Sequence, residues 1–251
     1  MQPRIRAALF HFTLSAVVAG AVFLPIYFLW YPGVLFESAG GRGLFFLTVG
    51  VQMTVGPLIT LIIFKPGKWG LVFDLWVIGI VQAAALSYGV YVLFEARPVY
   101  IAFVKDRFEI VRANAFPEGE LAKAHATGYD NLSWTGPRIV GVKLPTDPHE
   151  RLELMESSFA GIDAENFPRY YVPYADVRGE VTAKAGPLDT LRKRNPQRAG
   201  EIGQALAAIG RKEEDVRFLP LRAGKDDLAV LVDAKSGEIV RIMSLFPWAQ
   251  K

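Results

Sequence analysis

Polar side chains at helical spacing inside long apolar stretches are the residues of this sequence best placed for chemistry. His11 and Ser15 lie four residues apart in the first stretch, and Gln52, Gly56 and Thr60 repeat that interval in the second. A spacing of four places each set along one face of a helix. Such faces pack transmembrane helices together, or they leave a surface laterally open to another transmembrane helix.

The third apolar stretch carries an acidic residue, Asp74, and the amide of Gln82. Asp74 follows Trp69 by five residues, which corresponds to about 7 to 8 Å along a helix. Ionisable side chains inside membranes are rare and usually paired. Asp74 is therefore either a solvated interfacial carboxylate satisfied by a group such as Lys68, or a counter-ion for a cation on a partner helix. Pro57 lacks an amide hydrogen and is expected to kink or loosen the second helix.

Three apolar stretches, residues 7–30, 43–64 and 70–94, must position these side chains. Each exceeds the roughly 20 residues that span a hydrocarbon core. The sequence therefore predicts a membrane protein with three transmembrane α-helices in residues 1–94, followed by a soluble α+β domain in residues 95–251.

Charge separates the two parts and excludes one class of function. The chain has 28 basic and 25 acidic residues, a net charge of +3. The charged residues of the membrane part are Arg4, Arg6, Arg42, Lys65, Lys68, Glu37 and Asp74, which account for the whole excess. Because the soluble part is neutral, a nucleic-acid partner is not expected.

The distribution of basic residues predicts the orientation in the membrane. Arg4 and Arg6 precede the first stretch, and Lys65 and Lys68 lie between the second and third, which places both segments in the cytoplasm. Three crossings then put the C-terminal domain in the periplasm of a double-membraned bacterium, with the protein multi-pass in the inner membrane. The first stretch also resembles a secretory signal, but it is longer than a usual signal core, so an uncleaved anchor is favoured.

Enzyme and metal signatures are missing from the sequence. It has no cysteine and three histidines, which argues against a Cys/His metal site, and no cofactor is expected. It shows no Gly-x-Ser-x-Gly elbow and no Walker-type loop. His149 and Glu150 could form a general-base pair but fit a helix start better, and the basic run 192–194 fits a helix end. The chain is therefore not expected to be an enzyme.

The soluble part shows short β-branched runs and helical segments with turn residues between them. Strands are predicted at 99–104, 108–111, 138–144, 216–221, 228–232 and 239–245, with helices at 148–159, 187–194 and 199–209. The long polar segment 116–137 is predicted to be a loop. A ligand sensor tethered to the membrane is the alternative function, although it would need a cytoplasmic output module, for which the short segments predicted on that side leave little room.

The membrane part resembles the TfpX/TfpZ family of type IV pilin accessory proteins. The motifs that carry this resemblance are Trp30-Tyr31-Pro32-Gly33, Gly56-Pro57-Leu58-Ile59-Thr60, Lys65-Pro66-Gly67-Lys68, Phe73-Asp74-Leu75, Gln82, Ala85-Leu86, Tyr88-Gly89 and Ala96-Arg97-Pro98-Val99-Tyr100. The match is close over roughly the first 115 residues and looser beyond. The resemblance implies an inner-membrane protein that promotes the stability, surface assembly or motility function of its own pilin.

The resemblance also suggests what the polar faces bind. Gln52, Asp74 and Gln82 are the expected contacts to the transmembrane helix of a major type IV pilin subunit. His11, Ser15, Gly56, Pro57 and Thr60 are expected to pack the helices or line a groove. Other inner-membrane components of the pilus are further expected partners, besides the lipid bilayer.

Overall fold

The computed structural model describes residues 2–249. Its first part consists of three long apolar helices, α1 (Pro3–Pro25), α3 (Gly41–Ile63) and α4 (Leu71–Glu95). A π-helical turn, Ile26–Trp30, extends α1, so that the first span covers Pro3–Trp30. All three are long and apolar enough to cross a membrane, as the sequence predicts.

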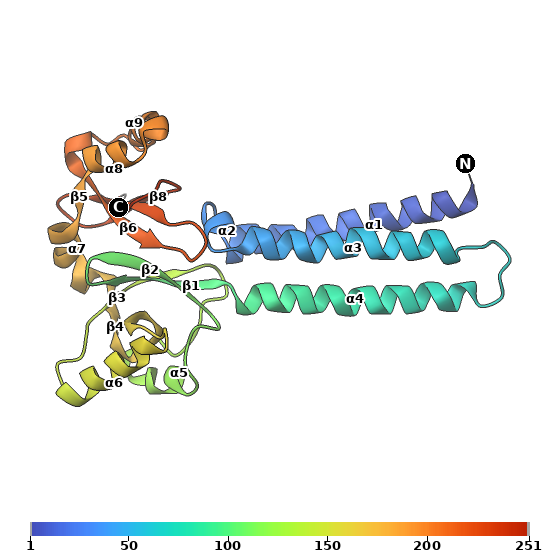
Figure 1. The fold of residues 1–251 in the computed structure, drawn as a ribbon, viewed down its shortest axis with the longest axis horizontal. Coiled ribbons are helices and arrows are strands. Elements are labelled where there is room, and N and C mark those ends of the chain that lie inside the picture. Colours follow the sequence, from blue (N-terminus) through green and yellow to red (C-terminus); the bar gives the residue numbers. More distant parts are fainter. Residues whose placement is uncertain (1, 250–251) are drawn as a thin grey trace.

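The three helices run side by side with α3 as the shared partner. Helix α3 packs along both α1 and α4, whereas α1 and α4 make little direct contact. Figure 1 shows the N-terminus and the α3–α4 turn at one end of the bundle and the soluble domain at the other. In that turn Lys68 N donates to Lys65 O, and Gly67 has a φ of +76°, which only glycine adopts without strain. Helix α3 is continuous through Pro57.

The second part is a mixed α+β domain built on one sheet. Its strands are β1 (Pro98–Val104), β2 (Arg107–Arg112), β3 (Arg138–Val142), β4 (Tyr171–Pro173), β5 (Gly186–Pro187), β6 (Val216–Arg222), β7 (Leu228–Asp233) and β8 (Ile239–Met243). In the described chain they form an eight-stranded sheet in the order β4-β3-β1-β2-β6-β7-β8, with β5 paired to β6. The β1–β3 and β2–β6 pairs are parallel, and the other pairs are antiparallel.

The central strand β1 separates two cores. Tyr100 and Ala102 face a cluster with Phe167 and Tyr171, while Ile101 and Phe103 face a second cluster formed with β6 and β7. Every residue of β1 is buried, because both faces of the sheet are covered there. This explains why the strand is a continuous apolar run in the sequence.

Short helices surround the sheet. They are α2 (Leu35–Ser38), α5 (Glu120–Lys123), α6 (Pro148–Phe159), α7 (Arg178–Lys184), α8 (Leu188–Arg194) and α9 (Ala199–Ala208). The predicted helix at 148–159 is confirmed, with Asp147 accepting from His149 N and Glu150 N at its start. The predicted loop 116–137 is wrong in part, because the helical turn α5 and a 3₁₀ turn, His125–Thr127, lie inside it.

The loop between α1 and α3 belongs to the core of the soluble domain. Leu35, on α2, is buried in the same cluster as Phe103 and Leu219. Ser38 O accepts a hydrogen bond from Lys225 N at 3.1 Å, and Ala39 O accepts one from Arg112 Nη2 at 3.2 Å. The helix bundle and the sheet are therefore joined by two segments of chain, this loop and the α4–β1 connection.

Candidate functional site

The polar faces of the three helices meet in one hydrogen-bonded cluster. His11 Nδ1 lies 2.7 Å from Thr60 Oγ1, and His11 Nε2 lies 2.5 Å from Gln82 Oε1. The Gln82 oxygen can only accept, so His11 Nε2 donates to it, whereas the Thr60 hydroxyl can either donate to Nδ1 or accept from it. The residues that share a helix face in the sequence are thus brought together from α1, α3 and α4.

Gln52 and Gln82 bond to each other reciprocally across α3 and α4. Gln52 Nε2 donates to Gln82 O at 2.7 Å, and Gln82 Nε2 donates to Gln52 O at 3.1 Å and to Gln52 Oε1 at 3.2 Å. Gly56 makes room for this pair, because a Cβ there would lie 2.0 Å from Gln82 Nε2. Polar contacts of this kind add on average about 0.6 kcal/mol each to helix association in membranes.

Two grooves border the glutamine pair. One lies between α1 and α4, has a volume of about 220 Å³, and includes His11, Ser15, Gln52 and Gln82 in its lining. The other runs along the α3–α4 pair, and we call it the α3–α4 groove. Its two sections have volumes of about 350 and 400 Å³ and are lined by Val55, Gly56, Ile59, Ile63, Phe73, Asp74, Val77, Ile78, Val81 and Gln82, and by Leu44, Leu47, Thr48, Val51, Gln52, Ala85, Tyr88, Gly89 and Val92.

The α3–α4 groove collects all three residues expected to contact a pilin helix. Asp74 and Gln82 line one section, and Gln52 lines the other. Asp74 is also paired within the chain, because its Oδ2 lies 2.5 Å from Lys68 Nζ in the adjacent turn. Both side chains remain partly exposed, so the pair is open to exchange with another cation. Pro57 is buried on α3 beside Gly56.

Residues at the end of the bundle next to the soluble domain connect the two parts, and the sequence placed them in family motifs without indicating this role. The hydroxyl of Tyr31 donates to Leu93 O at 3.0 Å, and this carbonyl lies in the last turn of α4, where intrahelical partners are missing. Burial raises the pKa of Tyr31 well above its ordinary value, which keeps the donor protonated. In the sequence Tyr31 appears only within the motif Trp30-Tyr31-Pro32-Gly33, which does not indicate its partner.

Arg97 forms the second fixed point at this end. Its guanidinium lies 3.6 Å from the ring centroid of Phe94 and donates to Phe94 O at 2.6 Å and to Ser133 O at 3.1 Å. Phe94 in turn packs edge-to-face against Trp30 and at a tilt against Trp134, with centroid distances of 5.1 and 5.0 Å. Burial lowers the pKa of Arg97 without removing its charge at neutral pH.

The soluble domain holds a buried acidic group, Glu109, and a half-buried one, Glu165, near β2. Burial raises the pKa of Glu109, which is held by Arg107 at 2.5 Å and Arg222 at 3.4 Å. Burial also raises the pKa of Glu165 to about 7, and the nearby Glu109 and Asp163 add to this effect. Within residues 2–249, no three His, Cys, Asp or Glu side chains are grouped to hold a metal ion.

The remaining candidates from the sequence have structural roles in the domain. His149 lies in the first turn of α6, where its side chain is exposed and Nδ1 is 3.4 Å from Glu153 Oε1. In the basic run, Arg192 binds Glu213, and Arg194 donates to Pro247 O. These arginines tie α8 to neighbouring segments.

Comparisons with known proteins find similarity to fimbrial assembly proteins. Residues 1–33 match the family model of the fimbrial assembly protein FimB. Fimbrial assembly proteins of Dichelobacter nodosus serogroups I and E1 are 30% and 31% identical over 214 residues, covering 84% of this chain and 83% of each relative. The protein of serogroups C1 and C2 is 35% identical over 116 residues, covering 45% of this chain and 88% of that relative. No solved structure matches the chain.

Proposed function

Because this chain belongs to the family of fimbrial assembly proteins, we propose that it is an inner-membrane accessory protein that binds a type IV pilin subunit and promotes its assembly. It acts as a chaperone-like protein of the TfpX/TfpZ type, without catalysis, and supports the stability and surface assembly of the subunit and the motility function of the pilus. The N-terminus is cytoplasmic and the α+β domain is periplasmic.

The observation that carries this proposal is the α3–α4 groove, which is largely apolar and has Gln52, Asp74 and Gln82 in its lining. In the hydrocarbon layer every backbone polar group must be satisfied internally, so a protein segment that enters this groove must be helical. Gly56 and Gly89 have no side chains and so deepen the groove. Asp74 provides a carboxylate at the end of the groove near the α3–α4 turn. A helix with a cation near its cytoplasmic end fits this arrangement, and a single-spanning pilin subunit supplies such a helix.

Weak binding suits this role. The side-chain amides of Gln52 and Gln82 are already hydrogen-bonded within the bundle. A pilin helix in the groove therefore gains no extra affinity from pairing polar groups that were unsatisfied before it bound. Each polar contact contributes about 0.6 kcal/mol and at most about 1.7 kcal/mol. A subunit held this way can leave for the fibre.

Site-specific photocrosslinking in cells that make the cognate pilin tests the proposal. A photoreactive residue at Asp74 or Val77, which line the α3–α4 groove, should yield an adduct with the pilin. The same residue at Phe10, which is exposed on α1, serves as the control and should yield none. If neither groove position recovers pilin, the subunit does not bind there.

A charge-neutral variant adds a functional readout. Asp74→Asn should lower the surface level of pilin about two- to tenfold, since one pair of charges near an interface contributes about 1 kcal/mol. The variant itself should insert normally, which membrane fractionation measures. Loss of both insertion and surface pilin would indicate that Asp74 only stabilises the protein.

A further inference from the structure

Helix α6 presents an unusual row of exposed apolar side chains. Leu152, Met155 and Phe159 are 51%, 55% and 88% exposed, and none of the helix's twelve residues is buried. Their spacing of three and four residues places them on one face. Glu156 lies on the same face between them. Contiguous exposed apolar side chains with a polar rim mark interaction surfaces.

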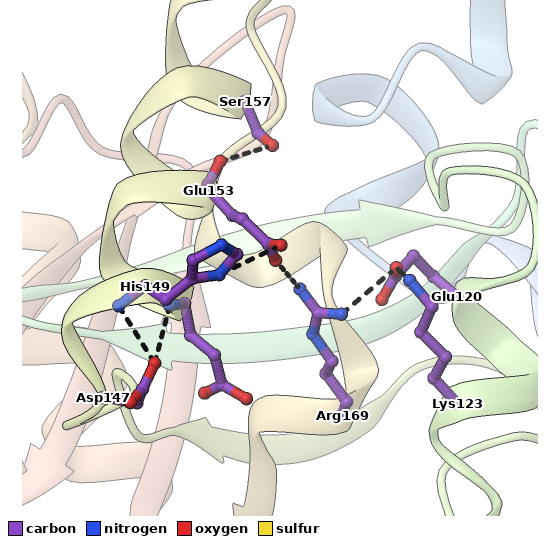
Figure 2. A network of polar contacts seen from close by, with 8 residues as sticks. Glu120, Lys123, Asp147, His149, Glu153, Ser157 and Arg169 are labelled. Carbon is purple, nitrogen blue, oxygen red and sulfur yellow. Dashed lines mark hydrogen bonds and ion pairs between the residues drawn. The ribbon is translucent and has the colours of Figure 1, made fainter.

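The orientation of this face is fixed by contacts on the other side of α6. Leu154 packs against the core cluster of β1 and β3, and Arg151 Nε donates to Pro145 O at 2.8 Å. Figure 2 shows Arg169 between α6 and α5, where it lies 3.7 Å from Glu153 and 3.5 Å from Glu120. The apolar row therefore points outward because the opposite face is anchored.

The charge around the row is acidic. Helix α6 contains three glutamates and one arginine. Glu153 is paired with Arg169, whereas Glu150 and Glu156 have no basic group within 4 Å in residues 2–249. Of the two, Glu156 borders the row and remains available to a basic side chain of a partner, whereas Glu150 lies on the face of Leu154.

A pocket of about 410 Å³ continues this surface at Met155. Its lining includes Met155, Leu144, Asp163 and Glu165. The lining holds three basic side chains, Lys105, Arg107 and Arg151, and two acidic ones, Asp163 and Glu165, so the pocket itself has no acidic excess. The preference for a basic partner therefore rests on the carboxylates of α6.

The position of α6 excludes the lipid surface as its cover. Along the long axis of the molecule, Figure 1 shows α6 toward the end opposite the membrane helices. We propose that the row Leu152, Met155 and Phe159 with Glu156 docks a protein segment whose apolar side chains are flanked by lysine or arginine. This inference rests on the proposed function and assigns the segment to the extramembrane part of the pilin subunit.

Photocrosslinking on α6 tests the surface directly. A photoreactive phenylalanine analogue at Phe159 should form an adduct with co-expressed pilin, and the same analogue at Phe246, 45% exposed elsewhere in the domain, should not. An adduct between two copies of this chain would show that the face is a self-interface and would overturn the proposal. So would the absence of any adduct at Phe159 while the groove position Val77 still captures pilin.

Charge reversal provides a second, matched test. Glu156→Lys should reduce the pilin that copurifies with the full-length protein by about three- to tenfold, because it places a like charge opposite the basic partner. Glu214→Lys, on a 75% exposed side chain far along the chain, should leave recovery unchanged. Equal recovery with both variants overturns the α6 surface but leaves the proposed function standing. If the wild-type protein recovers no pilin, both fall.

Discussion

At the scale of single residues, the close packing of α3 and α4 depends on glycine at the positions where a polar side chain of one helix contacts the backbone of the other. A Cβ at Gly56 would lie 2.0 Å from Gln82 Nε2, and a Cβ at Gly89 would lie 2.3 Å from Thr48 Cγ2. Both contacts bring α3 and α4 together. The Gln52–Gln82 bonds form only because the two backbones approach this closely.

Gly56→Ala should therefore destabilise the bundle. The added methyl would collide with the Gln82 amide and break its bonds to Gln52, at a cost of about 1 to 3 kcal/mol. Gly50→Ala, on the same helix, meets no atom within 4 Å and should be neutral or slightly stabilising. Thermal unfolding in mild detergent measures the difference. Equal melting temperatures for the two variants would mean that the glutamine pair adds nothing to stability.

The sequence predicts which polar residues of the bundle share a face, but not which partners they choose. The spacing of His11, Gln52, Thr60 and Gln82 follows from helix geometry, and the structure brings all four together. Asp74 left two alternatives, and the pair with Lys68 depends on the path of the turn. Periodicity gives the direction of a side chain and does not give the distance to another helix.

At the scale of elements, the bounds of long periodic segments are well predicted, and short elements are not. The helices at 148–159 and 199–209 and the strand pair around 234–237 agree with the structure to within about two residues. Strands β4 and β5 and helix α2 were not anticipated. Each has two to four residues and forms because of its tertiary neighbours rather than its own sequence.

The stability of the junction between the bundle and the sheet should depend on the hydroxyl group of Tyr31. Tyr31→Phe keeps the buried ring but removes the hydrogen bond to Leu93 O, which should cost about 1 to 2 kcal/mol and lower the melting temperature by a few degrees. Tyr91→Phe, on an exposed ring of α4, is the matched control and should change little. A similar small effect in both variants would show that the C-terminal turn of α4 is satisfied without Tyr31.

At the scale of the whole molecule, the arrangement of the ends predicts a topology. The N-terminus and the α3–α4 turn lie together at the end of the bundle away from the soluble domain. The basic residues at that end, among them Lys65 and Lys68, favour the cytoplasm. The predicted topology therefore places the soluble domain in the periplasm.

Alkaline phosphatase fusions check this orientation, since the enzyme folds only outside the cytoplasm, where disulfides form. A fusion after Ala96, behind three spans, should be active, and one after Gly67, behind two spans, should be inactive. A cytoplasmic fluorescent reporter at the same two positions should give the opposite pattern. Activity after Gly67 and none after Ala96 would invert the topology and remove the periplasmic partner surface.

Leu35 has a consequence for how the chain matures. It comes from the short connection between the first two spans, yet it fills the interior beside Phe103 and Leu219, which are translated much later. The hydrophobic core of the soluble domain is therefore complete only when the sheet packs against Leu35, which is synthesised before it. A fragment that begins after α4 would lack Leu35, and the part of its hydrophobic core that Leu35 fills would be exposed to water.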